Sequence, residues 1–237
     1  MCLIALFHQP HTLILAANRD EDYERPTLDA HFWTDAPHVL GGRDALHGGS
    51  WLAITRGGRF AAVTNLRGAE RMPRSRGALV RDFVTSSVKP RAFADALLLD
   101  ALQYSGFHLL AGQAGGEIVH VTRESWTSLA AGIHAISNAP LGESWPKTTI
   151  AAAALAENHD ADSLMRFLTT PRNSGSVESE VFIAGDRYGT RASTLIVVSE
   201  REIQFAERTF ARGGVAMRSY SLAFPIDGSS ETSSTSG

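Results

Sequence analysis

The sequence contains very little cysteine and no long hydrophobic run. Among its 237 residues there is one cysteine, Cys2, so an internal disulfide is impossible and nothing indicates an oxidising compartment. No apolar stretch approaches the roughly 20 residues that a membrane-spanning helix requires. No basic segment precedes the first apolar run, as it would in a secretory signal. We therefore expect a cytoplasmic protein without an integral membrane segment.

A large excess of charge and the motifs of common cofactor sites are also missing. The 22 Lys and Arg nearly balance the 25 Asp and Glu, and the formal net charge of -3 excludes a generally basic nucleic-acid-binding protein. There is no Walker loop, no Gly-x-Gly-x-x-Gly and no His-Glu-x-x-His, and the histidines lack partners at ligand spacing. We expect no nucleic-acid partner, no cofactor and no metal site.

Hydrophobic periodicity predicts blocks of strands that alternate with pairs of helices. Short apolar runs bounded by turn residues predict strands at 2–8, 12–17, 51–56, 59–65, 107–113, 117–122, 127–130, 133–138, 194–199, 201–209 and 219–224. Helical spacing predicts helices at 76–88, 91–103, 147–158 and 162–168. The short connections argue against a doubly wound parallel sheet and favour two stacked antiparallel sheets covered by helices.

The chain is expected to form a single domain over residues 1–226. The apolar fraction of 43% is typical of globular proteins, and neither an internal repeat nor a linker interrupts this region. The remaining residues, 227–237 (DGSSETSSTSG), are polar and low in complexity, so we predict a disordered tail.

The position of the single cysteine is the most informative feature of the chain. Removal of Met1 by methionine aminopeptidase, which accepts a small second residue, would leave Cys2 with a free α-amine. One residue would then hold a thiol with a pKa of about 8.5 and an amine with a pKa of about 7.7–8.0. The thiolate can attack an acyl carbon while the amine carries the proton. Position alone is equally consistent with a small apolar residue at the start of a strand.

Four polar residues, 18–21, directly follow the second predicted strand. If the first two strands pair as an antiparallel hairpin, the end of the second lies beside the start of the first. The sequence Asn18-Arg19-Asp20-Glu21 would then lie next to Cys2. A carboxylate there can orient the amine, and a guanidinium can hold the thiolate or an anionic substrate group. This register favours a functional site over a solvated turn.

Together these segments resemble a known family. The Met-Cys start, LILAANRDE at 13–21, GGSWLAITRGGRFAAVTNLR at 48–67, AISNAP at 135–140 with Trp145 shortly after, and YGTRASTLIVV at 188–198 are similar to the NRDE family of transport-and-Golgi-organisation proteins. The similarity runs from the first residue to about residue 224. It implies an α+β fold, the αββα sandwich of the N-terminal-nucleophile (Ntn) hydrolases.

A more distant resemblance is to choloylglycine hydrolases and penicillin V acylases, which start with the same Met-Cys and hydrolyse amides. Their second strand ends in Arg-Asn-x-Asp. Asn18 and Asp20 match the asparagine and the aspartate, but Ala17 stands where those enzymes carry arginine, and Arg19 takes the variable position. If Arg19 points away from the thiol, the amidase interpretation weakens.

This resemblance implies roles for three further residues. Asn65, at the end of a strand, matches an asparagine of the oxyanion hole, where a neutral donor stabilises the tetrahedral intermediate. Asn138 matches the asparagine of a Thr-Asn-x-Pro segment near the scissile group, and Arg191 matches a late arginine near the nucleophile. Taken singly, each is an ordinary strand-end or turn residue. Their joint presence in the expected order favours the functional interpretation.

A local excess of positive charge follows Asn65. Residues 67–81 contain five arginines and a single acidic residue, Glu70. They form either a solvated loop or a patch that steers an anionic ligand toward the site. Trp51 and Trp145 are expected in the core or in a pocket wall. The substrate-binding residues that we predict are Asn18, Trp51, Arg67 and Trp145.

Two hypotheses follow. The first is an Ntn cysteine hydrolase that cleaves a small amide or thioester, possessing the catalytic residues Cys2, Arg19, Asp20, Asn65, Asn138 and Arg191. The second, which the family resemblance also implies, is a non-catalytic carrier of the same fold for haem or an acyl-coenzyme A type of ligand. Either way the partner is a small molecule, which is anionic if the arginines of 67–81 form a steering patch, and the sequence leaves the oligomeric state open.

Overall fold

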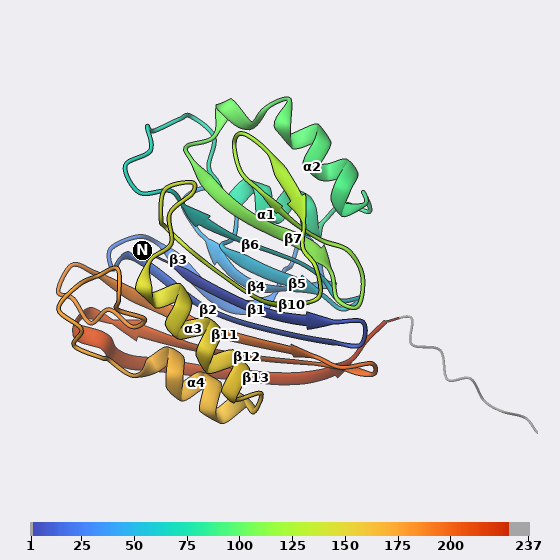
Figure 1. The fold of residues 1–237 in the computed structure, drawn as a ribbon. Coiled ribbons are helices and arrows are strands. Elements are labelled where there is room, and N and C mark those ends of the chain that lie inside the picture. Colours follow the sequence, from blue (N-terminus) through green and yellow to red (C-terminus); the bar gives the residue numbers. More distant parts are fainter. Residues whose placement is uncertain (1, 228–237) are drawn as a thin grey trace, which may run out of the picture.

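The protein folds into four layers, with two β-sheets stacked between two pairs of helices (Figure 1). The computed structural model describes residues 2–227. Of the tail predicted over 227–237, all but Asp227 therefore lies outside the described residues. The named strands pair antiparallel in both sheets. This architecture confirms the predicted αββα sandwich.

The first sheet joins the N-terminal hairpin to strands from the second half of the chain, in the order β10-β1-β2-β11-β12-β13. Its strands are β1 (Leu3–Gln9), β2 (Thr12–Asp22), β10 (Gly132–Ser137), β11 (Tyr188–Val198), β12 (Glu202–Ala211) and β13 (Val215–Pro225). The N-terminal hairpin is therefore internal to the sheet, with β10 on one side and β11 on the other (Figure 1).

The second sheet is a meander whose strands follow one another in chain order. They are β3 (Thr27–Phe32), β4 (Val39–Asp44), β5 (Leu52–Thr55), β6 (Arg59–Asn65), β7 (Phe107–Gln113), β8 (Ile118–Val121) and β9 (Trp126–Ser128). Residues 56–58 connect β5 to β6 and contain the predicted Gly57-Gly58 turn, in which Gly58 has a positive φ of 79°.

One pair of helices covers each outer face. The helices α1 (Gly77–Val84) and α2 (Pro90–Leu98), with the short 3₁₀ helix η1 (Ala101–Gln103), pack on the second sheet. The helices α3 (Pro146–Glu157) and α4 (Ala161–Thr169) pack on the first sheet, and η2 (Arg212–Gly214) connects β12 to β13. Pro90 and Pro146 each occupy the first helical position, where the missing N–H costs nothing.

Three apolar layers hold these elements together. Leu6, Leu15 and Phe60 belong to the layer between the sheets. A second layer lies between the second sheet and α1 and α2, and a third lies between the first sheet and α3 and α4. Because side chains alternate along a strand, each sheet residue faces either its partner sheet or its helices. This alternation decides which side of the first sheet each candidate site residue occupies.

The N-terminal strands differ from the prediction at one important point. The segment 18–21 was expected after the end of a strand, but β2 continues to Asp22. Its extension pairs with β11, where Asp20 is opposite Thr190 and Asp22 is opposite Tyr188. The polar character of these residues hid the strand, because a buried position can also hold a polar side chain that finds a hydrogen-bond partner.

Other differences are local. The strands β3 and β4 were not predicted, because glycines and charged residues interrupt their apolar pattern. The predicted helix 91–103 ends at Leu98 and continues only as η1, and Leu99 and Leu102 are largely exposed. The strand β13 begins at Val215 rather than at residue 219, because its first residues pair with β12. These residues are exposed and show no apolar alternation, so the sequence does not reveal the pairing.

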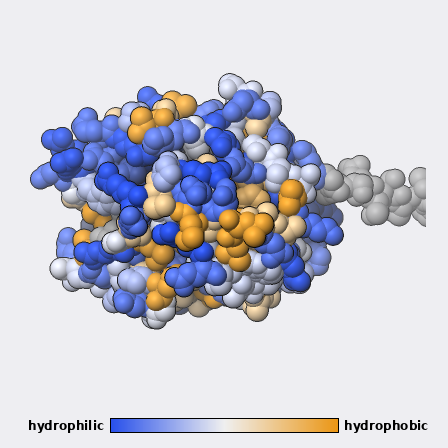
Figure 2. Space-filling model, turned by 90° about the horizontal axis from the view of Figure 1, so that it is seen from above, coloured by the Kyte–Doolittle hydropathy of each residue, from blue (hydrophilic) through white to orange (hydrophobic). Residues whose placement is uncertain are grey.

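The outer surface is mixed in polarity. On the face shown in Figure 2, hydrophilic side chains predominate, and the apolar groups gather mainly in a band near the middle of the face, with smaller spots elsewhere. Among residues 2–227, no helix has the length and apolar character needed to cross a bilayer.

Candidate active site

Strand pairing places Cys2 at one end of the sandwich, between two polar strand ends. Leu3, the next residue, pairs with Ser137 of β10 on one side and with Asn18 of β2 on the other. Extending the register by one residue brings Cys2 beside Asn138 and Arg19. The alternation along β1 turns Cys2 to the same side as Ile4, which packs between the sheets. The hairpin register predicted from the sequence therefore holds.

The partly exposed Cys2 lines an open cavity of about 410 Å³ between the two sheets. Three predicted site residues line it with the thiol, namely Arg19, Asp20 and Asn65. Trp51 lines it as well, and the loop and first residues of α1 at 71–77 form another wall. Beside Cys2 itself, the structure thus brings four of the other nine predicted site residues to this cavity.

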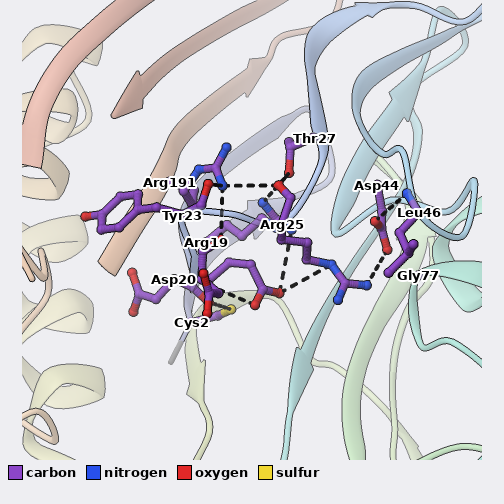
Figure 3. Close-up of polar contacts among 12 residues, drawn as sticks. Cys2, Arg19, Asp20, Tyr23, Arg25, Thr27, Asp44, Leu46, Gly77 and Arg191 are labelled. Atoms are coloured by element: carbon purple, nitrogen blue, oxygen red, sulfur yellow. Dashed lines mark hydrogen bonds and ion pairs between the residues drawn. The ribbon is translucent and has the colours of Figure 1, made fainter. Parts of the chain in front are cut away.

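The thiol lies in a mixed electrostatic environment. Burial raises the pKa of the Cys2 thiol, the charge of Asp20 adds to this increase, and Arg19 opposes it. The Sγ atom lies 3.9 Å from the backbone oxygen of Asp20 (Figure 3). A nucleophilic role therefore requires a base close to the sulfur, because the thiol by itself holds its proton more firmly than an exposed cysteine does.

Arg19 is buried beside the cavity and held on three sides. Its guanidinium carbon lies 4.4 Å from the centre of the Trp51 ring, its Nη1 donates to Thr27 Oγ1 at 3.2 Å, and its Nη2 lies 3.6 Å from a Glu21 carboxylate oxygen. Trp51 in turn packs closely against Gly42, where a Cβ would come within 2.2 Å of the ring. Gly42 therefore fixes the tryptophan, and the tryptophan fixes the arginine.

The displaced arginine still faces the thiol. Ala17 and Arg19 are two residues apart on β2, so their side chains project from the same face of the sheet. Ala17 packs between the sheets, and the charge of the Cys2 thiolate raises the pKa of Arg19 against the lowering effect of burial. An arginine expected at the position of Ala17 from the resemblance to choloylglycine hydrolases therefore has a counterpart in Arg19, two residues further along the same face of β2. The direct contacts of the Arg19 guanidinium are with Thr27, Glu21 and Trp51, and it acts on the thiol through its charge.

Asp20 lies on the opposite face of β2, toward the helices. It is buried, and its Oδ1 accepts a hydrogen bond from Thr190 Oγ1 at 2.7 Å. Burial raises the pKa of the Asp20 carboxyl, whereas the positive charge of Lys147 and the bond from Thr190 lower it. The Asp20 carboxyl and the Cys2 sulfur therefore lie on opposite faces of the first sheet, both near the beginning of the chain.

Lys147 is a site residue that the sequence did not reveal. It lies in the first turn of α3, its side chain is fully buried, and its Nζ has no hydrogen-bond partner among residues 2–227. Burial lowers the pKa of Lys147, and the charges of Asp20 and Cys2 raise it again. In the sequence, Lys147 directly follows Trp145-Pro146 at the start of a predicted helix. A lysine at such a position is ordinarily exposed to solvent, so the sequence does not mark it as a site residue.

Asn65 and Asn138 are joined across the two sheets. The Nδ2 of Asn138 donates to both the backbone oxygen of Asn65, at 2.6 Å, and its Oδ1, at 2.7 Å. Asn138 is fully buried, and its backbone oxygen accepts from the Arg67 N–H at 3.0 Å. Since the Oδ1 of Asn65 is occupied, its own Nδ2 is the group left to donate into the cavity.

A histidine pair supports the strand end that carries Asn138. His108 Nε2 lies 3.1 Å from the Ala139 carbonyl oxygen, and its Nδ1 lies 3.0 Å from His120 Nε2. A carbonyl only accepts, so His108 donates from Nε2 and accepts from His120 at Nδ1. Burial lowers the pKa of His120 to about 4, which keeps the pair neutral. Within residues 2–227, no cluster of three His, Cys, Asp or Glu side chains is arranged to hold a metal ion.

Arg191 does not line the cavity of the thiol. It occupies a bulge in β11, and its Nη1 donates to the backbone oxygens of Asp22, Tyr23 and Arg25 at 2.7–3.2 Å. These bonds hold the turn that follows β2 (Figure 3). Its side chain faces a second cavity of about 340 Å³, which shares Trp51 with the first. A bulge beside a site commonly re-aims a side chain in this way.

The other predicted binding residues also lie outside the cavity of about 410 Å³. The Asn18 side chain is buried toward the helices, where its Nδ2 donates to the Leu168 and Val181 carbonyls at 2.8 Å each. Arg67 forms an ion pair with Glu178, and its guanidinium carbon lies 5.7 Å from the ring centre of Trp145, which immediately precedes α3. Asn138 does not line that cavity either, and reaches it only through Asn65.

The layered fold, with a cysteine at the start of an inner strand, defines the class as Ntn-hydrolase-like. The mutant conjugated bile acid hydrolase of Clostridium perfringens superposes with a TM-score of 0.55 at 8% identity, covering 94% of this chain and 92% of that chain. The penicillin V acylase of Agrobacterium tumefaciens gives a TM-score of 0.56 at 10% identity, covering 95% and 86%. At these identities the likeness establishes the fold alone.

Sequence comparison identifies the family. The profile described as Transport and Golgi organisation 2 matches residues 1–212. The Transport and Golgi organization protein 2 homologs of Bos taurus and Homo sapiens are 30% and 28% identical to this chain, each over 88% of it and 93% of their own length. The chain belongs to the Transport and Golgi organisation 2 family, which confirms the resemblance found in the motifs.

Proposed function

We propose that the protein is an Ntn cysteine hydrolase that cleaves a small amide, or a thioester, through an acyl-enzyme on Cys2 after removal of Met1. The observation that carries the proposal is the setting of Cys2 in a cavity lined by Arg19, Asp20 and Asn65, where Asp20 presents its backbone oxygen to the thiol. A cysteine that only packs at a strand start needs no such polar neighbours, whereas a nucleophile does.

The reaction uses the two groups of the processed first residue. The α-amine of Cys2 takes the proton of the thiol, and Sγ forms a bond to the acyl carbon. The bond from that carbon to the amide nitrogen, or to the thioester sulfur, then breaks, and the leaving group takes the proton from the ammonium. Water attacks the acyl-enzyme with the amine as base, and this releases the acid and restores the thiol.

The asparagine pair supplies the proposed oxyanion site. Asn65 borders the cavity with Cys2, and Asn138 holds its side-chain oxygen, which directs the Nδ2 of Asn65 to the acyl oxygen. A donor fixed in place before the reaction stabilises developing negative charge more than a mobile one does. Asn138 then acts as a positioning residue for Asn65.

The charged residues divide between the two faces of β2. Asp20, with Lys147 and Thr190 around it, orients the α-amine from the side of the helices. Arg19 stabilises the thiolate from the side of the cavity, where it opposes the effect of burial on the pKa of Cys2. Arg191 contributes indirectly, by holding the turn that begins at Asp22.

One observation favours the alternative, a carrier of the same fold that binds its ligand without turnover. Burial raises the pKa of the Cys2 thiol, so the thiolate is scarce unless the neighbouring amine is free. A chain that keeps Met1 has no such amine at Cys2, and would retain only the cavity. The hydrolase therefore requires Cys2 to be the first residue of the processed chain, whereas the carrier also tolerates a retained Met1.

Turnover by cysteine variants tests the proposal. Purified protein is incubated with a panel of short-chain acyl amides and acyl thioesters, and product is quantified by mass spectrometry. We expect Cys2→Ala to abolish turnover and Cys2→Ser to reduce it by at least about 100-fold, because a hydroxyl is a far weaker nucleophile at neutral pH. Hydrolysis by Cys2→Ala at the wild-type rate rejects the hydrolase, and ligand binding that survives Cys2→Ala without turnover by the wild type supports the carrier.

A further inference from the structure

We propose that Arg76 forms an anion-binding subsite in the Cys2 cavity, and that the substrate carries an oxyanion group, a carboxylate or a phosphate, at the end opposite its scissile bond. That the bound molecule is a substrate rests on the proposed function, whereas anion binding at Arg76 does not require turnover. Arg76 and Cys2 line the same cavity, and Arg76 immediately precedes α1.

The ion pairs of the cavity single out Arg76. Of the five arginines that line it, Arg25 pairs with Asp44 at 2.6 Å, Arg74 pairs with Asp100, and Arg19 contacts Glu21. Two remain without a carboxylate partner among residues 2–227, the exposed Arg71 and the partly buried Arg76. Exposed guanidinium groups are satisfied by water, so the informative one is Arg76.

The surroundings of Arg76 compensate its charge only in part. The one hydrogen bond of its side chain within residues 2–227 is a long contact of 3.4 Å from Nη1 to the Gly106 carbonyl oxygen. Burial lowers the pKa of Arg76, and the charges of the Cys2 thiolate and Glu21 oppose this effect. A partly desolvated cation without a partner is costly, and an anionic ligand would offset that cost.

The start of α1 adds to the positive potential. The first turn of this helix contains no acidic residue, the side chain of Arg76 does not cap it, and the Gly77 N–H donates to the uncharged Ser75 Oγ at 3.3 Å. Ser75, Arg76 and Gly77 line the cavity, so the positive end of the helix dipole faces the space that an anionic group would occupy. The sequence alone left the arginines of 67–81 as either a solvated loop or an anion-steering patch. The structure assigns the second role to one of them.

Selective alkylation of the thiol tests the subsite directly. Because Cys2 is the only cysteine, every alkylation event reports on this cavity. Iodoacetate and iodoacetamide attack the same thiolate and differ mainly in charge, so the ratio of their rate constants measures local attraction for an anion. We expect Arg76→Gln to lower this ratio by about 3- to 10-fold at low ionic strength, and Arg76→Lys to retain most of it.

Arg74→Gln is the matched control, because Arg74 lines the same cavity but is already paired with Asp100. We expect it to change the ratio by less than about twofold. An unchanged ratio in Arg76→Gln overturns the subsite. An equal fall in Arg74→Gln also overturns it, since the attraction would then be a property of the whole charged loop.

Protection by anions identifies the class of group and does not depend on a folded variant. At constant ionic strength, inorganic phosphate or acetate should slow the reaction of wild-type protein with iodoacetate. The more protective of the two distinguishes a phosphate from a carboxylate subsite, and no protection by either overturns the proposal. Turnover that depends on Cys2 together with an unchanged alkylation ratio would reject the subsite and leave the hydrolase intact.

Discussion

The side-chain amide of Asn138 donates to the Oδ1 of Asn65 at 2.7 Å and thereby ties the end of β10 in one sheet to the end of β6 in the other. A second cross-sheet bond, from Thr64 Oγ1 to the Ser137 carbonyl oxygen at 3.0 Å, lies next to it. The two sheets are thus held together at the end of the sandwich where Cys2 lies. The cavity geometry depends on this connection.

The two asparagines should respond differently to substitution. Asn65→Ala removes the proposed donor and one of the two acceptors of Asn138 Nδ2, while the bond from Asn138 to the Asn65 backbone oxygen remains. We therefore expect turnover to fall by about 100-fold or more with only a small change in stability. Asn138→Ala also leaves buried carbonyl groups without a donor, so it should lower the free energy of unfolding by about 1–3 kcal/mol as well. Turnover assays and urea denaturation measure the two effects. An equal loss of stability in both variants would contradict this division of roles.

Lys147 should act on the pH dependence of the reaction through Asp20. Its charge lowers the pKa of the Asp20 carboxyl, so Lys147→Met should raise that pKa and move the acid limb of the turnover profile to higher pH. The chain has one other lysine, the exposed Lys89, which makes Lys89→Met the matched control. A lysine that serves only packing would leave the position of the acid limb unchanged in both variants.

Glu207 should make the protein less stable as the pH rises. Its buried carboxyl accepts from the Ala30 N–H of the other sheet at 3.0 Å and from Thr194 Oγ1 at 2.8 Å. Burial raises the pKa of Glu207 to about 7, so between pH 4.5 and about 7 the folded state holds a proton that the unfolded state has lost. This proton stabilises the fold at low pH, and its contribution disappears as the pH rises through the folded pKa.

Substitution isolates this contribution. Glu207→Gln keeps the shape but cannot ionise, so its free energy of unfolding relative to the wild type should increase by about 2–3 kcal/mol between pH 4.5 and pH 8. Thermal or urea denaturation of both proteins across this range provides the measurement. A constant difference between the two curves would show that Glu207 titrates normally in the fold.

The sequence was sufficient for the architecture and for the neighbourhood of Cys2. Both follow from local patterns, since apolar alternation marks the hairpin β1–β2 and the hairpin register places 18–21 beside the first residues. The sequence could not show that Arg19 and Asp20 point to opposite faces, because that requires knowing that β2 continues to Asp22. A polar run looks the same in a strand and in a turn.

Long-range contacts explain the remaining differences. Asn18 binds carbonyls more than 100 residues away in the chain, and Arg191 binds the turn after β2, so their local sequence contains no trace of either role. Lys147 is hidden for the same reason, since a lysine in the first turn of a helix is ordinarily exposed. Buried charge becomes visible only when the packing around it is known.

The proposed reaction requires a free α-amine and a reactive thiol in the same residue, Cys2. Intact-mass and peptide-level mass spectrometry of protein purified from cells, before and after incubation with a reactive acyl donor, measures both at once. We expect a mass that lacks Met1, and after incubation one acyl group located on Cys2 that hydroxylamine removes. A chain that retains Met1, or that is never acylated at Cys2, would contradict the proposal.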